Sequence, residues 1–360
     1  MSDPRIQKLA QTLVRYSVAA GKGQTVGVSA ETAAEPLVVA VFEELVKAGA
    51  FPVVRLTPEA LPEILLRKGR PWHFTTVSQF LLSYARIVDS TISIRALSNT
   101  RALSATDPAR QAMLSKTQQP ISEIILEKLW VLTLYPTQAY AQDAEMSLSD
   151  FQDFVFGATF SDETSPIRAW KELSRRQAKL VSKLRGARTV RIVGRGTDLT
   201  MSVKGRRFIN SDGHHNMPSG EIFTGPVEDT AEGHIEYDFP VCHAGREIDG
   251  VRLVFRKGRV VEASARKNEK FLHAMLDTDP GARYLGELGI GTNRRIQRFI
   301  KNILFDEKIG GTVHLALGRS YKETGGKNKS ALHWDMIKDL RRGGALYVDG
   351  RVFQKDGKFV

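Results

Sequence analysis

The 360-residue sequence has a single cysteine, Cys242, and lacks the features of an exported or membrane protein. One cysteine excludes a framework of intrachain disulfides and fits a reducing compartment. No apolar run approaches the ~20 residues of a membrane-spanning helix, and residues 1–6 lack the basic and then apolar pattern of a secretory signal. We therefore expect a cytoplasmic protein with no membrane partner.

Motifs for binding nucleotides and nucleic acids are also missing. Gly21 and Gly23 precede the first predicted strand, whereas the loop of a dinucleotide site follows its strand. The net charge of +12 would fit a nucleic-acid partner, but there is no zinc-finger or helix-turn-helix pattern. The densest basic run, residues 175–191, has apolar neighbours at helical spacing (Leu173, Ala178, Val181 and Leu184), which indicates a solvated helix face. We expect no nucleic acid partner.

The length favours two domains, because one hydrophobic core seldom organises this many residues. Strand–helix–strand alternation over residues 24–29, 32–48 and 51–56 predicts an α/β unit with parallel strands. Thr32 and Glu35 have the form of a capping box for its helix. Further strands are predicted at 85–94 and 128–134, with a helix at 107–116 between them. We assign residues 1–170 to an α/β scaffold domain.

The pattern changes after residue 187, where short alternating strands are separated by Gly, Asn and Asp turns. A helix at residues 165–184 leads into this part. Strands are predicted at 189–193, 198–203, 251–255 and 259–264, and helices at 269–276 and 293–303. We assign residues 171–360 to a strand-rich α+β catalytic domain that binds metal.

The segment 330–340 contains the first pair of candidate metal ligands, His333 and Asp335. On an extended chain these two side chains project to the same side, and an imidazole and a carboxylate are both ligands for divalent metals. The His-x-Asp spacing alone is weak support. It gains weight from Glu221, Glu287 and His314, which lie upstream among glycines and small residues.

Each upstream candidate also has a structural interpretation. Glu221 and Glu287 could be solvated loop or turn residues, and a single histidine in an apolar strand, such as His314, is most often a satisfied core residue. Tyr321 could be a packed aromatic at the end of a strand. These alternatives stay open on the residues alone.

Four motifs, in order along the chain, resemble those of the aminopeptidase T/aminopeptidase S family of metallopeptidases, also called thermophilic aminopeptidases. They cover residues 218–226, 286–293, 311–321 and 330–337, and the N-terminal half is similar around residues 48–54 and 90–95. The resemblance implies a metal-dependent aminopeptidase that removes the N-terminal residue of short peptides. By residue match it implies that the metal ligands are Glu221, Glu287, His314, His333 and Asp335.

The same resemblance implies two divalent ions per chain (zinc, cobalt or manganese), a catalytic Tyr321 and a homodimer. Three carboxylates and two imidazoles are a donor set that suits two dications and a water activated between them. Glu221 or Glu287 would receive the proton from that water and pass it to the leaving amine. Tyr321 would donate to the oxyanion of the tetrahedral intermediate.

Two other classes remain open. His314, His333 and Asp335 alone form the two-histidine, one-carboxylate set of mononuclear Fe(II) oxygenases, and ring-cleaving dihydroxypyridine dioxygenases are similar to this peptidase family over the whole chain. The presence of both glutamates favours the peptidase. A basic nucleic-acid-binding protein with an inactive site is the least favoured alternative.

Overall fold

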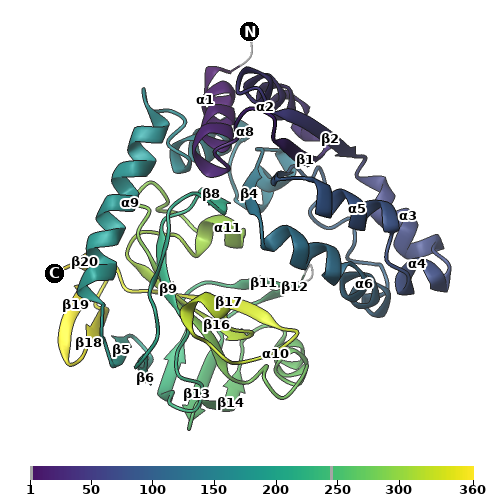
Figure 1. Cartoon of the computed structure of the whole chain (residues 1–360). Coiled ribbons are helices and arrows are strands. Elements are labelled where there is room, and N and C mark those ends of the chain that lie inside the picture. Colours follow the sequence, from purple (N-terminus) through teal and green to yellow (C-terminus); the bar gives the residue numbers. More distant parts are fainter. Residues whose placement is uncertain (1–2, 244–245) are drawn as a thin grey trace. The chain divides into compact units, whose positions relative to one another are not determined.

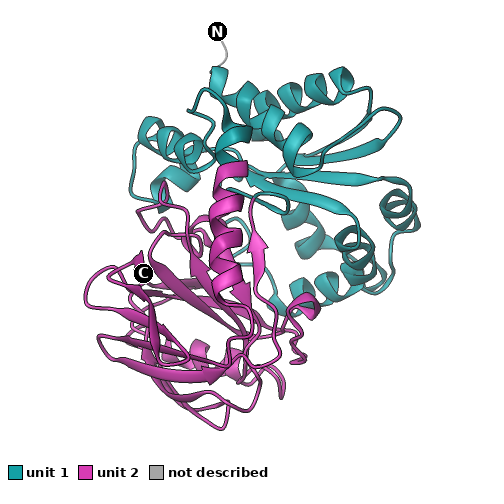
Figure 2. Cartoon of the chain, turned by 60° about the vertical axis from the view of Figure 1, so that its left-hand side comes forward, with its two compact units in different colours: residues 1–170, 213–218 teal, residues 171–212, 219–360 magenta. Residues whose placement is uncertain are grey.

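The computed structural model describes residues 3–243 and 246–360. The chain forms two compact units (Figure 2). Unit 1 contains residues up to 170 together with 213–218, and unit 2 contains residues 171–212 and 219–360. Across the described residues, no helix has both the length and the apolar character that crossing a membrane requires.

Unit 1 contains a sheet of parallel strands in the order β2-β1-β3-β4-β8. Its strands are β1 (Thr25–Glu31), β2 (Phe51–Thr57), β3 (Ser90–Arg95), β4 (Leu129–Leu134) and β8 (Asn216–Met217). Its helices are α1 (Pro4–Thr12), α2 (Glu35–Lys47), α3 (Ala60–Lys68), α4 (Pro71–Thr75), α5 (Gln79–Ile87), α6 (Pro108–Leu126), α7 (Gln138–Asp143) and α8 (Leu148–Ala158). Helices α1 and α2 cover one face and α5 and α6 the other (Figure 1). The parallel α/β prediction is therefore confirmed.

Two local predictions in unit 1 are wrong, and a third, the helix at 107–116, is confirmed but too short. The strand predicted at 85–94 begins only at Ser90, because residues 85–87 complete α5, whose first turn is capped by the Ser78 hydroxyl. Thr32 does not cap α2, since it lies in a 3₁₀ turn (Thr32–Ala34) that precedes the helix. The helix predicted at 107–116 continues to Leu126 as α6.

Unit 2 contains two larger antiparallel sheets. The first has the strand order β14-β13-β10-β6-β5-β18-β19-β20. Its strands are β5 (Thr189–Gly194), β6 (Thr197–Ser202), β10 (Glu232–Glu236), β13 (Arg252–Arg256), β14 (Arg259–Ser264), β18 (Ala345–Val348), β19 (Arg351–Lys355) and β20 (Lys358–Phe359). The strand-rich prediction for this part of the chain is confirmed.

The second sheet, which we call the β7–β17 sheet, has the strand order β17-β16-β15-β9-β7. Its strands are β7 (Ile209–Ser211), β9 (Glu221–Thr224), β15 (Leu285–Gly291), β16 (Thr312–Gly318) and β17 (His333–Asp339). The short strands β11 (Val241–His243) and β12 (Arg246–Ile248) pair with each other. The helices are α10 (Glu269–Leu276), α11 (Ile303–Asp306) and α9 (Pro166–Lys183), which begins in unit 1 and continues into unit 2.

The core of unit 2 is one hydrophobic cluster to which both of its larger sheets contribute. Leu288, Ile290, Val313, Leu315 and Leu317 of the β7–β17 sheet are fully or almost fully buried in it. Each such side chain contributes about 1.5–3 kcal/mol by leaving water. Because side chains alternate along a strand, the residues between these core positions face the other side of the sheet.

Two predictions about helices in unit 2 have different outcomes. The helix predicted at 293–303 is wrong: α11 covers only Ile303–Asp306, because the Asp306 carboxylate accepts hydrogen bonds from the Ile300 and Asn302 amides and holds the preceding segment as a loop. The basic helix face is present on α9, where Arg175, Arg176 and Lys179 are exposed. Gln177, not Ala178, is buried on its inner side.

Candidate metal centre

The five ligand candidates lie on four neighbouring strands of the β7–β17 sheet. Glu221 begins β9, Glu287 lies on β15, His314 on β16, and His333 and Asp335 on β17. The alternation along each strand places them on the face opposite the hydrophobic core. The extended His333–Asp335 step that the sequence predicted is present.

Every one of these ligand candidates faces a glycine or alanine on an adjacent strand. The cross-strand pairs are Glu221 with Gly291, Glu287 with Ala316, His314 with Gly289, His333 with Gly318, and Asp335 with Ala316. The contact at Gly289 is the tightest of these, because a Cβ there would lie 2.0 Å from Cε1 of His314. The small residues of the 286–293 and 311–318 motifs therefore provide room for imidazole and carboxylate groups above the sheet.

The side chains form a continuous series of contacts. His314 Nε2 lies 3.3 Å from Glu221 Oε2 and 3.5 Å from Glu287 Oε1. His333 Nε2 lies 3.3 Å from Glu287 Oε2 and 3.6 Å from Asp335 Oδ2. Glu287 thus lies between the two imidazoles, and all five candidates meet within one site.

Both histidines are held by their other ring nitrogen. His314 Nδ1 lies 3.1 Å from the Glu307 carbonyl oxygen, and His333 Nδ1 lies 2.8 Å from the Arg319 carbonyl oxygen. A carbonyl can only accept, so each Nδ1 donates. This arrangement fixes the tautomer that leaves the Nε2 lone pair available for a metal.

The electrostatics of the site depend on the balance between burial and pairing. Burial raises the pKa of Glu287, but the adjacent imidazoles of His314 and His333 outweigh it and hold the pKa at about 2. Burial lowers the pKa of His333, while the charges of Asp335 and Glu287 raise it to about 9. For His314 the same two carboxylates and Glu221 outweigh burial and raise the pKa. The carboxylates of the site therefore stabilise positive charge, here on the imidazoles of His314 and His333.

Three buried polar atoms of this site have no hydrogen-bond partner within the described part of the chain. They are Glu221 Oε2, His314 Nε2 and Asp335 Oδ1. Buried polar groups are rarely left unsatisfied in folded proteins. All three are atoms that ligate divalent metals, so these residues fit a metal ion.

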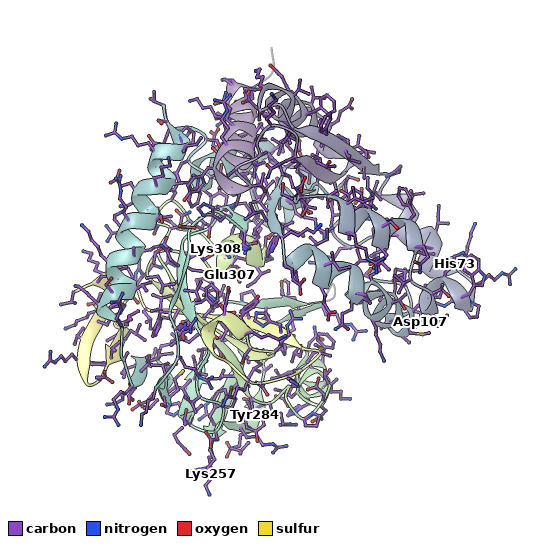
Figure 3. All side chains as sticks on the ribbon, in the orientation of Figure 1. His73, Asp107, Lys257, Tyr284, Glu307 and Lys308 are labelled. Carbon is purple, nitrogen blue, oxygen red and sulfur yellow. The ribbon has the colours of Figure 1, made fainter. Side chains whose placement is uncertain are left out.

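Two residues that the sequence analysis did not select complete the site. Glu307 forms a second compact group with Glu221 and His314, in which one donor atom from each lies within 4.8 Å of the others. Lys308, labelled with Glu307 in Figure 3, has a fully buried side chain. Its Nζ contacts Glu307 Oε1 and lies 3.3 Å from Glu221 Oε1. The adjacent acidic residues Asp306 and Glu307, seven to eight positions before His314, were the available signal.

Tyr321 lies at the edge of the site. Its ring packs edge-on against His333 at 5.1 Å and against Phe223 at 5.6 Å between ring centroids. Burial of the hydroxyl, together with the nearby charges of Glu287, Asp335 and Glu221, raises its pKa well above the usual value. The hydroxyl therefore keeps its proton at neutral pH and can act as a donor.

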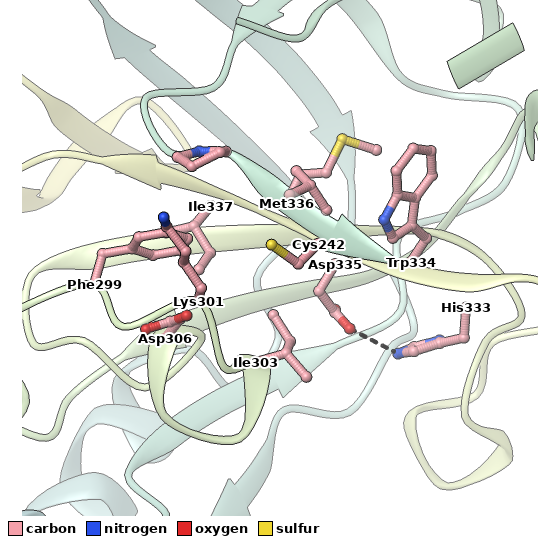
Figure 4. A pocket seen from close by; sticks show the side chains of 12 residues that line it. Cys242, Phe299, Lys301, Ile303, Asp306, His333, Trp334, Asp335, Met336 and Ile337 are labelled. Atoms are coloured by element: carbon pink, nitrogen blue, oxygen red, sulfur yellow. Dashed lines mark ion pairs between the residues drawn. The ribbon is translucent and has the colours of Figure 1, made fainter. Parts of the chain in front are cut away.

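A pocket lies along β17 next to His333 and Asp335, which form an ion pair on its wall (Figure 4). Its apolar lining includes Phe299, Ile303 and Ile337. Cys242 also lines this pocket as a partly buried thiol. His214 and His215 pack against the rings of Tyr16 and Trp130, respectively, in unit 1.

The chain is similar to known proteins over its full length. Residues 2–359 match the family described as thermophilic metalloprotease (M29). Aminopeptidase 2 from Geobacillus stearothermophilus is 29% identical over 406 aligned positions, which cover 99% of this chain and 95% of that protein. Aminopeptidase T from Thermus thermophilus is 27% identical, with 96% of this chain and 95% of that protein covered.

Two solved structures share the fold. Wild-type AmpT from Thermus thermophilus has a TM-score of 0.87 at 24% identity, with 99% of both chains covered. The 2,5-dihydroxypyridine dioxygenase from Pseudomonas putida KT2440 has a TM-score of 0.64 at 17% identity, with 100% of this chain and 98% of that chain covered. At these identities the likeness concerns the fold alone, and a peptidase and an oxygenase both use it.

Proposed function

This chain belongs to the thermophilic metalloprotease (M29) family, and from that membership we propose that it is a metal-dependent aminopeptidase acting on short peptides. The match confirms the resemblance carried by the four sequence motifs. One observation supports the activity most directly. On one face of a single sheet, Glu221, His314 and Asp335 each have a buried metal-ligating atom without a hydrogen-bond partner among the described residues.

The centre uses divalent metal, and two ions per chain suit its donors. Glu221, Glu307 and His314 form one compact group and would hold one ion. Glu287 and Asp335 group with His314 and also contact His333, and would hold the other ion. Zinc, cobalt and manganese are all compatible with a mixture of carboxylates and imidazoles. When bound, the ions supply Lewis acidity that polarises the peptide carbonyl and makes water nucleophilic at neutral pH.

The protein groups have separate roles in hydrolysis. Glu221 or Glu287 would accept the proton of the attacking water and deliver it to the leaving amine. Tyr321 donates its hydroxyl proton in a hydrogen bond to the developing oxyanion, an effect worth roughly 3–4 kcal/mol for a well-placed donor. The Glu307 and Arg319 carbonyl groups keep the two imidazoles in the orientation that binds metal.

The pocket beside His333 and Asp335 supports a preference among peptides. Phe299, Ile303 and Ile337 give it an apolar wall, which would bind an aliphatic side chain next to the scissile bond. We therefore infer that peptides with an aliphatic first residue are better substrates than peptides that begin with an acidic one.

The donor set also separates the peptidase from the mononuclear Fe(II) dioxygenase. That oxygenase centre needs two histidines and one carboxylate. Here Glu221, Glu287 and Glu307 add three carboxylates around His314. Their extra negative charge suits two dications better than one ferrous ion.

The domain roles and the oligomeric state complete the proposal. Residues 1–170 would act as the scaffold domain and residues 171–360 as the catalytic domain, in the cytoplasm. Exposed apolar side chains gather on the neighbouring elements α2 and β2 of unit 1, namely Val39, Phe42, Val46 and Phe51. Apolar surface of this kind marks protein interfaces and supports a homodimer.

A panel of dipeptides tests the activity. The purified protein is stripped of metal, reloaded separately with zinc, cobalt or manganese, and assayed for released amino acid. We expect metal-dependent release, faster from leucyl than from aspartyl dipeptides. Oxygen consumption with ferrous iron and a dihydroxypyridine, without release of amino acid from any dipeptide, would reject the peptidase in favour of the dioxygenase.

A further inference from the structure

Lys308 places a cation inside one half of the metal centre. Its side chain is fully buried, contacts Glu307 Oε1 and lies 3.3 Å from Glu221 Oε1. These two glutamates are the carboxylate donors of the group that they form with His314. The ammonium therefore interacts with the same two carboxylates that would ligate a metal ion.

The other half of the metal centre has no such lysine among the described residues. Among the described residues, the ion pairs of Glu287 and Asp335 are made with His314 and His333, and neither carboxylate pairs with a lysine or arginine. An imidazole that gives up its Nε2 proton becomes a metal ligand in place, whereas a lysine ammonium has three donors and no lone pair and must move away. The half formed by Glu287, His333 and Asp335 therefore consists of groups that can all become metal ligands, whereas the Glu221–Glu307 half also contains the Lys308 ammonium.

We propose that Lys308 is a built-in cation that competes with one of the two metal ions, so that the chain binds its ions unequally. The first ion binds tightly at Glu287, His333 and Asp335. The second binds at Glu221 and Glu307 only as the Lys308 ammonium moves away from them. The inference rests on the proposed two-ion function and assigns a different affinity to each half.

The physical reason is charge balance in a buried site. A lysine ammonium carries one charge on a flexible stem, so it can neutralise part of the two carboxylates when no metal is present and withdraw when a dication arrives. Removing one member of a buried ion pair leaves the other charge uncompensated, which destabilises the fold. Without Lys308, the metal-free protein should therefore depend more strongly on metal for its stability.

The test compares Lys308→Met with wild type. Methionine keeps the length of the side chain and removes its charge. Lys338→Met is the matched control, because Lys338 is also buried in unit 2 and pairs with Asp238 at 3.0 Å and with the Arg195 carbonyl. Lys338 follows Asp335 by three positions on β17, so it projects to the opposite face of the sheet.

Zinc alone is titrated into metal-free protein by calorimetry, and thermal unfolding is recorded with and without zinc. In wild type and Lys338→Met we expect two unequal binding steps. In Lys308→Met the second step should tighten by about tenfold or more, since removal of one charge next to the site changes binding by at least that factor at partly buried distances. The rise in Tm on adding zinc should be larger in Lys308→Met than in the other two proteins.

If Lys308→Met does not fold without metal, Lys308→Gln is purified with zinc and titrated with a competing chelator for the same ratio of affinities. Two ions of equal affinity in wild type, or an unchanged second step in both Lys308 variants, would overturn the role of Lys308 while the proposed function stands. Binding of no zinc by any of the proteins would instead reject the proposed metal centre.

Discussion

Each unit of this protein buries glutamate, but the two sets of glutamates have different surroundings. In unit 1, Glu44 is fully buried and accepts from Arg15 at 2.6 Å, Gln7 at 2.7 Å and Lys47 at 3.1 Å. Burial raises its pKa, but the hydrogen bonds from Lys47, Arg15 and Gln7 outweigh burial and hold the pKa below its usual range. Glu44 is a satisfied structural residue.

In unit 2, Glu221 and Glu287 are also buried, but apart from Lys308 beside Glu221 their contacts are with other metal-ligand types. Glu221 Oε2 has no hydrogen-bond partner among the described residues, and Glu287 is shared between two imidazoles. Burial of a carboxylate therefore does not by itself mark a site. What distinguishes the centre is that several of its buried metal-ligating atoms have no hydrogen-bond partner in the described part of the protein.

The largest expected effect is seen when the same substitution is made at one buried glutamate in each unit. Glu287→Gln removes a charged ligand, so metal affinity and activity should fall by at least about a thousandfold, more than the 10–100-fold typical of losing an outer partner of a ligand. Metal content and amino-acid release are measured beside Glu44→Gln, which should retain both. Equal activity in the two variants would abolish the distinction between the units.

Tyr321→Phe should have the next largest effect. Loss of an oxyanion donor lowers turnover by about a hundredfold or more, while metal content stays unchanged because the hydroxyl is not a ligand. The control is Tyr140→Phe in unit 1, where burial raises the pKa of Tyr140 to about 12 and the hydroxyl accepts from the Leu97 amide. Normal turnover in Tyr321→Phe would refute the donor role.

Gly289→Ala tests whether the ligands depend on small cross-strand neighbours. The added methyl would lie 2.0 Å from His314 Cε1 and must displace the imidazole. We expect metal affinity to fall by about tenfold to a hundredfold, as when a ligand loses its orientation. Gly157→Ala, in α8 of unit 1, is the control, because its nearest new contact is an ordinary 3.8 Å. Metal titration of both variants measures whether metal affinity falls in Gly289→Ala and stays unchanged in Gly157→Ala.

Glu44→Ala should affect stability only. Removing the carboxylate leaves three donors without their acceptor, but Arg15 and Lys47 are half-exposed and can turn to water. We therefore expect a loss of about 1–3 kcal/mol in the free energy of unfolding, measured by denaturant titration, with specific activity unchanged. A variant that keeps its stability and loses activity would assign Glu44 to the function.

The smallest effect concerns pH. The pKa of Glu44 is lower in the folded protein than in the unfolded chain, so its contribution to stability is present above the ordinary glutamate pKa of about 4.5 and is lost as the pH falls through the folded value. Thermal unfolding between pH 6 and pH 3 should show a steeper loss in wild type than in Glu44→Gln. Parallel curves would show that this carboxylate is not selectively stabilised by folding.

The elements of the fold followed from local pattern wherever the pattern was strong. The strand at residues 51–56 corresponds to β2, and the strands at 251–255 and 259–264 correspond to the paired strands β13 and β14. The helix predicted at 293–303 failed because its apolar spacing is overridden by the Asp306 carboxylate, which binds the amides of Ile300 and Asn302. That interaction depends on burial, which spacing does not reveal.

The sequence by itself determined the family, the parallel and strand-rich parts of the fold, and five candidate ligands, because motifs and the period-2 alternation of strands are local properties of the chain. Only the tertiary structure brought Glu307 and Lys308 to the same site. Their positions depend on the loop before β16 and on its burial against Glu221, and a buried charge is recognised only by the groups that surround it.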